Sequence, residues 1–166
     1  QSTLSGNAGG GLQTTGGAFT IENNFIVDNG NTSLAGGGVD VSNGTDPSFF
    51  RFNTVAGNIA ATDGGAAVRC FRAGVTVTSN VVWGNTPVLQ VSGNCAWSYS
   101  DVQGGPQGTG NINSDPRFVS ASDYHLQASS PCQGAADPAG GVTVDVDGDS
   151  RPEGTGYDMG ADEVRE

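Results

Sequence analysis

Carboxylates near the C-terminal end have the types and spacing needed to hold a cation. They alternate with other residues from Asp145 to Asp149, and alternating carboxylates can converge on one hard ion such as Ca²⁺. The run does not match a helix–loop–helix calcium loop, because Gly148 is its fourth residue rather than its sixth. Calcium is the one candidate cofactor, and its candidate ligands are Asp145, Asp147, Asp149, Asp158 and Asp162. The alternative is a polar turn, in which these carboxylates accept hydrogen bonds from nearby backbone N–H groups.

Charge and composition exclude several other classes of function. The 166 residues include 17 acidic residues, six Arg and no Lys, which gives a net charge of −11, so no basic surface could bind nucleic acid. No apolar run approaches the roughly 20 residues of a transmembrane segment. The single His125 has no Cys/His cluster around it in the sequence, so we expect no zinc site there and a packing role rather than that of a base.

A repeat that ends in Asn runs through the first hundred residues. Its four blocks are 3–7, 25–29, 54–58 and 81–85, and the intervals between their final Asn residues are 22, 29 and 27. In three blocks another Asn lies five residues before the final one. The two sets are Asn7, Asn29, Asn58 and Asn85, and Asn24, Asn53 and Asn80. Short strand-like pieces with period-two alternation, without helical periodicity, predict one coil of a β-solenoid per repeat.

Stacked coils would place equivalent residues above one another, about 4.8 Å apart. The two Asn sets then form ladders, in which each side-chain amide bonds to the copies above and below. Glycine patches at 9–11, 36–38 and 64–65 are expected at corners. The predicted inward columns are Ile21, Phe50 and Val77, and Leu4, Ile26, Val55 and Val82. The predicted fold is all-β: a parallel β-helix of about four coils at 1–100, and an irregular cap at 101–166 packed on the last coil.

Two of the three cysteines fall at matching places in neighbouring coils. Cys70 follows Asn58 by 12 residues, and Cys95 follows Asn85 by 10. A coil spacing near 4.8 Å lies within the Cα separation, about 4.4–6.8 Å, that a disulfide requires. We therefore predict a Cys70–Cys95 disulfide, with Cys132 either free or competing for a partner.

The C-terminal region carries an ordered series of short motifs. In chain order they are 98–105, 110–112, 115–119, 123–126, 130–132, 145–148 and 157–163. Together with the repeat, they resemble the right-handed parallel β-helix repeat family of exported bacterial surface proteins, at the end described as a choice-of-anchor region. The resemblance implies a right-handed coil and a secreted or cell-surface location, and it assigns no reaction.

Catalysis is the less favoured interpretation of this pattern. A polysaccharide lyase needs stacked carboxylates around calcium and a Lys or Arg base, yet Asp28 aligns with glycines in the later repeats. Arg51, Arg69 and Arg72 fall in one repeat, and we expect no acids stacked beside them. The favoured function is a non-catalytic structural or adhesive module outside the cell. The alternative is a carbohydrate-active protein: a polysaccharide lyase, a glycoside hydrolase or a glycan-binding module.

The N-terminal end shows no cap, since residues 2–4 lead directly into the first repeat. An open coil end presents unpaired backbone groups and an apolar layer, which natural solenoids cover. We expect earlier coils or a second copy of the chain to cover it. Head-to-tail stacking of copies would give an open fibre, and surface glycans are the other candidate partner.

Overall fold

β-strands without helices make up the described part of the chain. The computed structural model describes residues 1–14, 16–41, 47–61, 66–71, 74–87 and 89–165. Within these ranges there is no helix, and hence none of the length and apolarity needed to cross a bilayer. The strands form three sheets, two of which are parallel throughout.

The two parallel sheets face each other across the core. The first contains seven strands: β1 (Ser2–Ser5), β3 (Thr20–Val27), β5 (Ser48–Ala56), β7 (Val75–Thr78), β8 (Val81–Trp83), β10 (Trp97–Ser98) and β11 (Asp101–Val102). The second contains β2 (Leu12–Gln13), β4 (Gly36–Asp40), β6 (Ala66–Cys70) and β9 (Val91–Gly93). A short antiparallel pair, β12 (Phe118–Ser120) and β13 (Asp123–Leu126), lies in the C-terminal region. The chain thus alternates between the two parallel sheets as it advances, an arrangement compatible with a β-solenoid.

The strand register confirms the predicted apolar columns. In the first sheet Ile21 pairs with Phe50, and Phe50 pairs with Val77. The other column, Leu4, Ile26, Val55 and Val82, is also in register through successive parallel pairs. Most of these side chains are buried in one cluster between the sheets. The core is therefore built from columns of apolar side chains, in which each residue lies above the equivalent residue of the previous repeat.

The glycine patch at 9–11 lies in a turn and bend before β2, whereas the patch at 36–38 is not a corner, which corrects the sequence expectation for it. Residues 36–38 lie within strand β4, and residues 64–65 lie outside the described part. A Cβ on Gly38 would come within 2.9 Å of Val55 Cγ1 and 3.0 Å of Asn58 Nδ2. The opposite sheet approaches too closely for any side chain, so glycine is required at this position by the narrowness of the coil.

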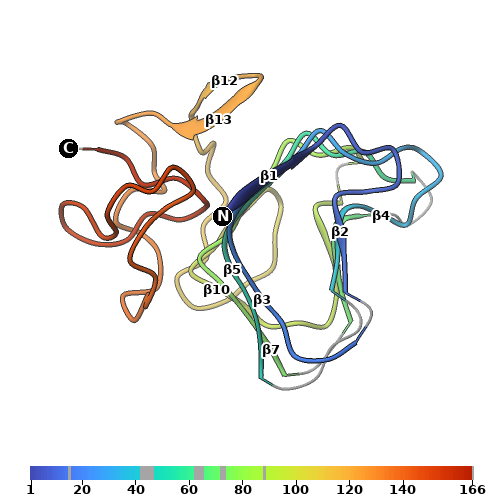
Figure 1. The fold of residues 1–166 in the computed structure, drawn as a ribbon, viewed down its shortest axis with the longest axis horizontal. Helices are drawn as coiled ribbons and strands as arrows, with labels where there is room; N and C mark the ends of the chain where they lie inside the picture. The colour runs from blue at the N-terminus through green and yellow to red at the C-terminus, as the bar shows by residue number, and fades with distance from the viewer. Residues whose placement is uncertain (15, 42–46, 62–65, 72–73, 88, 166) are drawn as a thin grey trace.

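The C-terminal region contacts the end of the stack, where Cys132 bonds to Asp101, and it also lies along the side of the stack. Figure 1 looks along the stack and shows this region on the outer side of β1, β3 and β5. Outward-facing Phe52 and Val81 join Leu126, Cys132 and Met159 in a second apolar cluster. Only the segment that follows β11 continues the stack, through the parallel bridge of Asp101 to Ile112. Parallel pairing therefore continues beyond residue 100, where the sequence placed the boundary.

Hydrogen bonds fix the C-terminal region to several successive strands. Asn23 donates from Nδ2 to the carbonyl of Val144, at 2.6 Å. Thr54 accepts the N–H of Ala161 at 3.0 Å, and the carbonyl of Ser79 accepts the N–H of Gly160 at 2.9 Å. The three contacting residues are sequence neighbours of Asn24, Asn53 and Asn80, which lie in register one above another. The contacts therefore run along the stack.

Candidate functional site

Both predicted Asn ladders are present as continuous chains of hydrogen bonds. In the first, Nδ2 donates to Oδ1 of the next Asn at 2.9, 3.1 and 2.9 Å, along Asn7, Asn29, Asn58 and Asn85. In the second, the same bond joins Asn24 to Asn53 at 2.9 Å and Asn53 to Asn80 at 3.2 Å. Most of these amides are buried, and satisfied buried amides fix a unique register because any slip would leave them unpaired.

Five of the seven ladder Asn side chains also close a left-handed corner within their own repeat: Asn24, Asn53, Asn58, Asn80 and Asn85. Asn53 donates to the carbonyl of Arg51, across Phe52, whose φ is +52°. Asn80 does the same across Ser79, whose φ is +59°. A non-glycine residue in this conformation costs free energy, of order 1 kcal/mol or more, and the side-chain bond compensates for it. The ladder thus stabilises both the corner and the stack.

Both ladders extend beyond the residues that the repeat predicts. Gln90 ends the first ladder, because its Oε1 accepts from the backbone N and Nδ2 of Asn85. Ser100 and Asn111 continue the second: Ser100 Oγ accepts from the N–H of Asn80, and Asn111 Oδ1 accepts from that of Ser100. The repeat does not predict these residues, because they differ from it in type or spacing.

The predicted disulfide joins the end of strand β6 to the segment that follows strand β9. Cys70 and Cys95 are bonded, with Cα atoms 5.6 Å apart, and Cys132 is a buried free thiol. Reduction should lower the free energy of unfolding by about 3 kcal/mol, because the bond closes a loop of 25 residues in the unfolded chain. Urea unfolding with and without reductant measures this loss. The Cys132→Ser variant is the control: it should show the same dependence on reductant, and a loss of that dependence would contradict the assignment.

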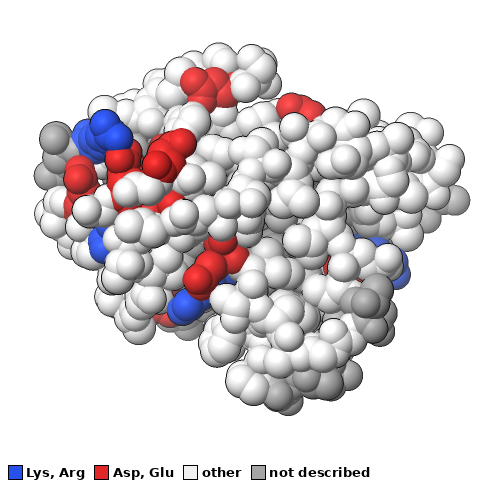
Figure 2. All heavy atoms as spheres, in the orientation of Figure 1, with Lys and Arg blue, Asp and Glu red and all other residues white. Residues whose placement is uncertain are grey.

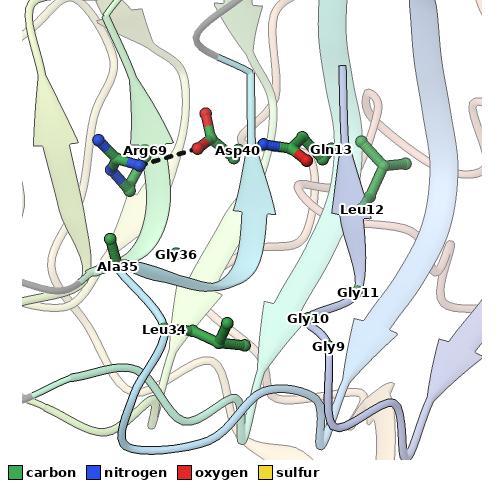
Figure 3. Close-up of a pocket in the computed structure, with 10 residues that line it drawn as sticks. All are labelled: Gly9, Gly10, Gly11, Leu12, Gln13, Leu34, Ala35, Gly36, Asp40 and Arg69. Carbon is green, nitrogen blue, oxygen red and sulfur yellow. Dashed lines mark hydrogen bonds and ion pairs between the residues drawn. The ribbon is translucent and has the colours of Figure 1, made fainter. Parts of the chain in front are cut away.

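A shallow groove of about 260 Å³ runs over β2 and β4, and it is shown in Figure 3. Its wall carries Gln13, Asp40 and Arg69, above a floor of glycine, Leu34 and Ala35. Arg69 donates to Asp40 at 2.9 Å, so the two charged groups in the groove neutralise each other. The groove therefore offers no free acid–base pair among the described residues that line it.

The arginines do have acids stacked beside them, contrary to expectation. Asp40 pairs in register with Arg69, and Glu22 with Arg51, whose Nη2 lies 2.9 Å from the Glu22 carboxylate. Arg72 lies outside the described residues. Because the side chains in each pair come from adjacent coils, the pairs are cross-strand contacts that support the stacking.

The five predicted calcium ligands do not converge on one point. Both oxygens of Asp145 accept backbone N–H groups, from Asp147, Asp149 and Glu163. Asp158 accepts two more N–H groups, from Gly134 and Val164. Asp149 pairs with Arg165. This arrangement is the polar turn that the sequence offered as the alternative. Among the proposed ligands, Asp147 and Asp162 are the two that group with His125 within 4.8 Å.

A cluster that the sequence did not indicate brings His125 together with these two carboxylates. Ligating atoms of His125, Asp147 and Asp162 lie within 4.8 Å of one another. The ring of His125 also packs edge-on against Phe25, so the expected packing role is only part of its environment. Burial by itself lowers the pKa of His125, but hydrogen bonds to Asp123 and Asp147 outweigh it and raise the pKa. The spacing Asp-x-His at 123–125 was the one available signal.

Arg151 is the buried cation of the C-terminal region. Its Nη2 donates to the carbonyls of Gly160 and Asp162, at 2.9 and 2.6 Å, and its Nε lies 3.3 Å from the Glu163 carboxylate. The guanidinium also lies 4.8 Å from the ring centroid of Phe52, in strand β5. Arg151 therefore connects the C-terminal region internally and holds it against the first sheet.

Asp101 is a fully buried carboxylate at the end of the stack. It accepts the N–H of Ser114 at 3.1 Å, and the thiol of Cys132 donates to it at 3.3 Å. Burial raises the pKa of Asp101 from 3.8 to about 6, and these hydrogen bonds only partly oppose that effect. Burial likewise raises the pKa of the Cys132 thiol, so this cysteine is not a nucleophile at neutral pH.

The raised pKa of Asp101 predicts a pH-dependent stability. Its contribution is fully present below the unfolded-state pKa near 3.8 and is lost as pH rises through about 6, because ionising the buried group is unfavourable. Between pH 4 and pH 7 the wild type should lose about 2–3 kcal/mol relative to Asp101→Asn, measured by urea unfolding at each pH. Parallel pH profiles for the two proteins would contradict this prediction.

Comparisons with protein-family models, with curated proteins and with solved structures find no match to this chain. Function must therefore be argued from the geometry of the ladders, the groove and the C-terminal region.

Proposed function

We propose that this chain is a non-catalytic structural module of a secreted or cell-surface protein. In this proposal it forms a right-handed parallel β-helix of about four coils that stacks end to end with a second copy. The observation that carries the proposal is the pair of continuous Asn ladders, which commit the buried amides to holding coils together. The disulfide supports a location outside the reducing cytosol.

Surface charge is compatible with this role. Figure 2 shows acidic side chains gathered over the C-terminal region, whereas the coils on this face are nearly uncharged. A net charge of −11 keeps an extracellular module soluble, and the nearly uncharged coil surface on this face would not repel a second copy.

Carbohydrate chemistry is the weaker candidate, although the groove over β2 and β4 would be its natural place. A glycosidase needs two carboxylates about 5–9.5 Å apart, and the groove contains the single carboxylate Asp40, already paired with Arg69. Glycan binding by this groove without catalysis is the alternative function. Glycan-array binding that is abolished by Arg69→Ala would favour it.

The free side of strand β1 is where a second copy would add its coil. β1 is the outermost strand of the first sheet and pairs only with β3 among the described strands. The carbonyl of Leu4 and the N–H of Gly6 face β3, since they bond to Asn29 and Asp28. Successive residues of a strand point their backbone N–H and C=O groups to alternate sides, so the N–H of Thr3 faces away from β3.

Blocking this edge should prevent assembly. Thr3→Pro removes an outward N–H without touching a bond to β3, so we expect concentration-dependent oligomers or fibres in the wild type and monomers in the variant. Light scattering after size exclusion, with negative-stain microscopy, measures both. Val119→Pro, in the exposed strand β12, is the control and should assemble normally. A wild type that stays monomeric at millimolar concentration would refute end-to-end stacking.

A further inference from the structure

The ring of His125 is held between two carboxylates on opposite sides. Its Nδ1 lies 2.5 Å from Asp123 Oδ1, and its Nε2 lies 2.8 Å from Asp147 Oδ2. A carboxylate on Nδ1 fixes the tautomer that carries the proton there and presents the lone pair of Nε2 to a metal ion. This is the usual supporting contact of a metal-binding histidine, and Asp123 supplies it.

The opening in front of Nε2 contains too much negative charge for a single imidazole to balance. Asp147 and Asp162 both line it, and Asp123 lies behind the ring. Arg165, which also lines the opening, is paired with Asp149. With Nδ1 protonated, the Nε2 lone pair would face the lone pairs of Asp147 at hydrogen-bond distance, and only a proton or a cation between them removes the repulsion.

Asp162 presents one carboxylate oxygen to the same opening. The residue is 7% exposed, and its Oδ2 accepts the N–H of Leu126 at 2.7 Å. Among the described residues no donor bonds to its Oδ1, although the side chain lines the same opening. Burial raises the pKa of Asp162, and nearby Asp145 and Asp147 act in the same direction. The Oδ1 of Asp162 is therefore available to a cation in this opening.

We infer that His125, Asp147 and Asp162 bind one divalent first-row transition metal, with Zn²⁺ as the representative ion. Zinc bonds of about 2.0–2.2 Å place neighbouring ligand atoms roughly 3.3 Å apart, which small side-chain rotations would produce from atoms now within 4.8 Å. The opening, of about 450 Å³, leaves the remaining position to water. An imidazole nitrogen with two carboxylates favours zinc over calcium, which prefers six to eight oxygens.

Such an ion would join three separate parts of the C-terminal region. His125 belongs to β13, Asp147 to the turn closed by the Val144–Ser150 bridge, and Asp162 to the segment near the C-terminal end. Binding to the folded state alone would raise its stability, so a shift in melting temperature accompanies the affinity.

Calorimetric titration of the EDTA-treated, dialysed chain with Zn²⁺, and separately with Ca²⁺, tests the inference. We expect one Zn²⁺ per chain, weaker Ca²⁺ binding, and at least tenfold weaker Zn²⁺ binding in Asp147→Asn and in His125→Gln. Asp149→Asn is the matched control, since this neighbouring carboxylate lines the same opening but bonds Arg165; its Zn²⁺ affinity should stay within about twofold. The absorption spectrum of bound Co²⁺ reports directly on the ligand set in each variant.

Three results would overturn the assignment. One is the absence of stoichiometric Zn²⁺ binding by the wild type, which would leave a proton as the only bridge between His125 and Asp147. Another is equal Zn²⁺ affinity in the wild type and both ligand variants, which would place the ion elsewhere on the acidic surface. The third is Ca²⁺ binding that excludes Zn²⁺ and survives His125→Gln, which would mean an all-oxygen site. Circular dichroism of each variant checks that it is folded.

Discussion

Replacing Asn58 with Ala should lower the free energy of unfolding by about 3–5 kcal/mol. The Asn58 amide donates to the carbonyls of Ile26 and Ala56 and to Oδ1 of Asn85. Its Oδ1 accepts from the backbone N and the Nδ2 of Asn29. The alanine leaves these buried groups without partners, and each such group costs about 1–3 kcal/mol. Urea unfolding followed by circular dichroism measures the loss.

The same substitution at the exposed end of the ladder is the control. Asn7 is exposed, and its side chain makes the single bond from Nδ2 to Asn29 Oδ1, which the backbone N–H of Asn7 also reaches. Asn7→Ala should therefore cost less than about 1 kcal/mol. Similar losses for Asn58→Ala and Asn7→Ala would mean that the interior of the ladder contributes no more than its end.

Arg151→Met should destabilise the protein by about 3–5 kcal/mol. The methionine keeps the apolar contact with Phe52, but it leaves the Glu163 carboxylate and the carbonyls of Gly160 and Asp162 buried without their cation. Burial already raises the pKa of Glu163, and the guanidinium opposes this, so without Arg151 the carboxylate is more costly still. Thermal and urea unfolding of the variant measure the effect.

Arg165 is the matched arginine for comparison. It pairs with Asp149, but its side chain is 73% exposed, and exposed ion pairs contribute about 1 kcal/mol or less. Arg165→Met should thus have little effect. If both variants lose the same stability, the buried position of Arg151 is irrelevant to its contribution.

The coil region was largely predictable from the sequence because its side chains repeat in register. Asn29 and Asn58 are equivalent in the sequence and bonded in the structure, and Cys70 and Cys95 are likewise joined. In a parallel stack, one interval in the sequence becomes one step along the sheet, so sequence spacing translates directly into contacts.

The C-terminal region was not predictable in this way, because its contacts join segments without a common period. His125 contacts Asp147 from a segment 22 residues away in the sequence, and Asp162 comes from a third segment. The carboxylates of Asp145 and Asp158 bond backbone N–H groups, which sequence spacing did not distinguish from metal binding. The outward-facing Phe52 gave no signal either, because an apolar outer face requires a covering partner that the repeat does not contain.

The position of the C-terminal region along the side of the stack has a mechanical consequence. Asn23, Thr54 and Ser79 belong to consecutive coils, and each is bonded to that region. A force that pulls on this region is therefore distributed over several coils at once, instead of peeling them away singly from one end. A protein anchored through its C-terminal side would resist shear far better than a bare stack of the same length.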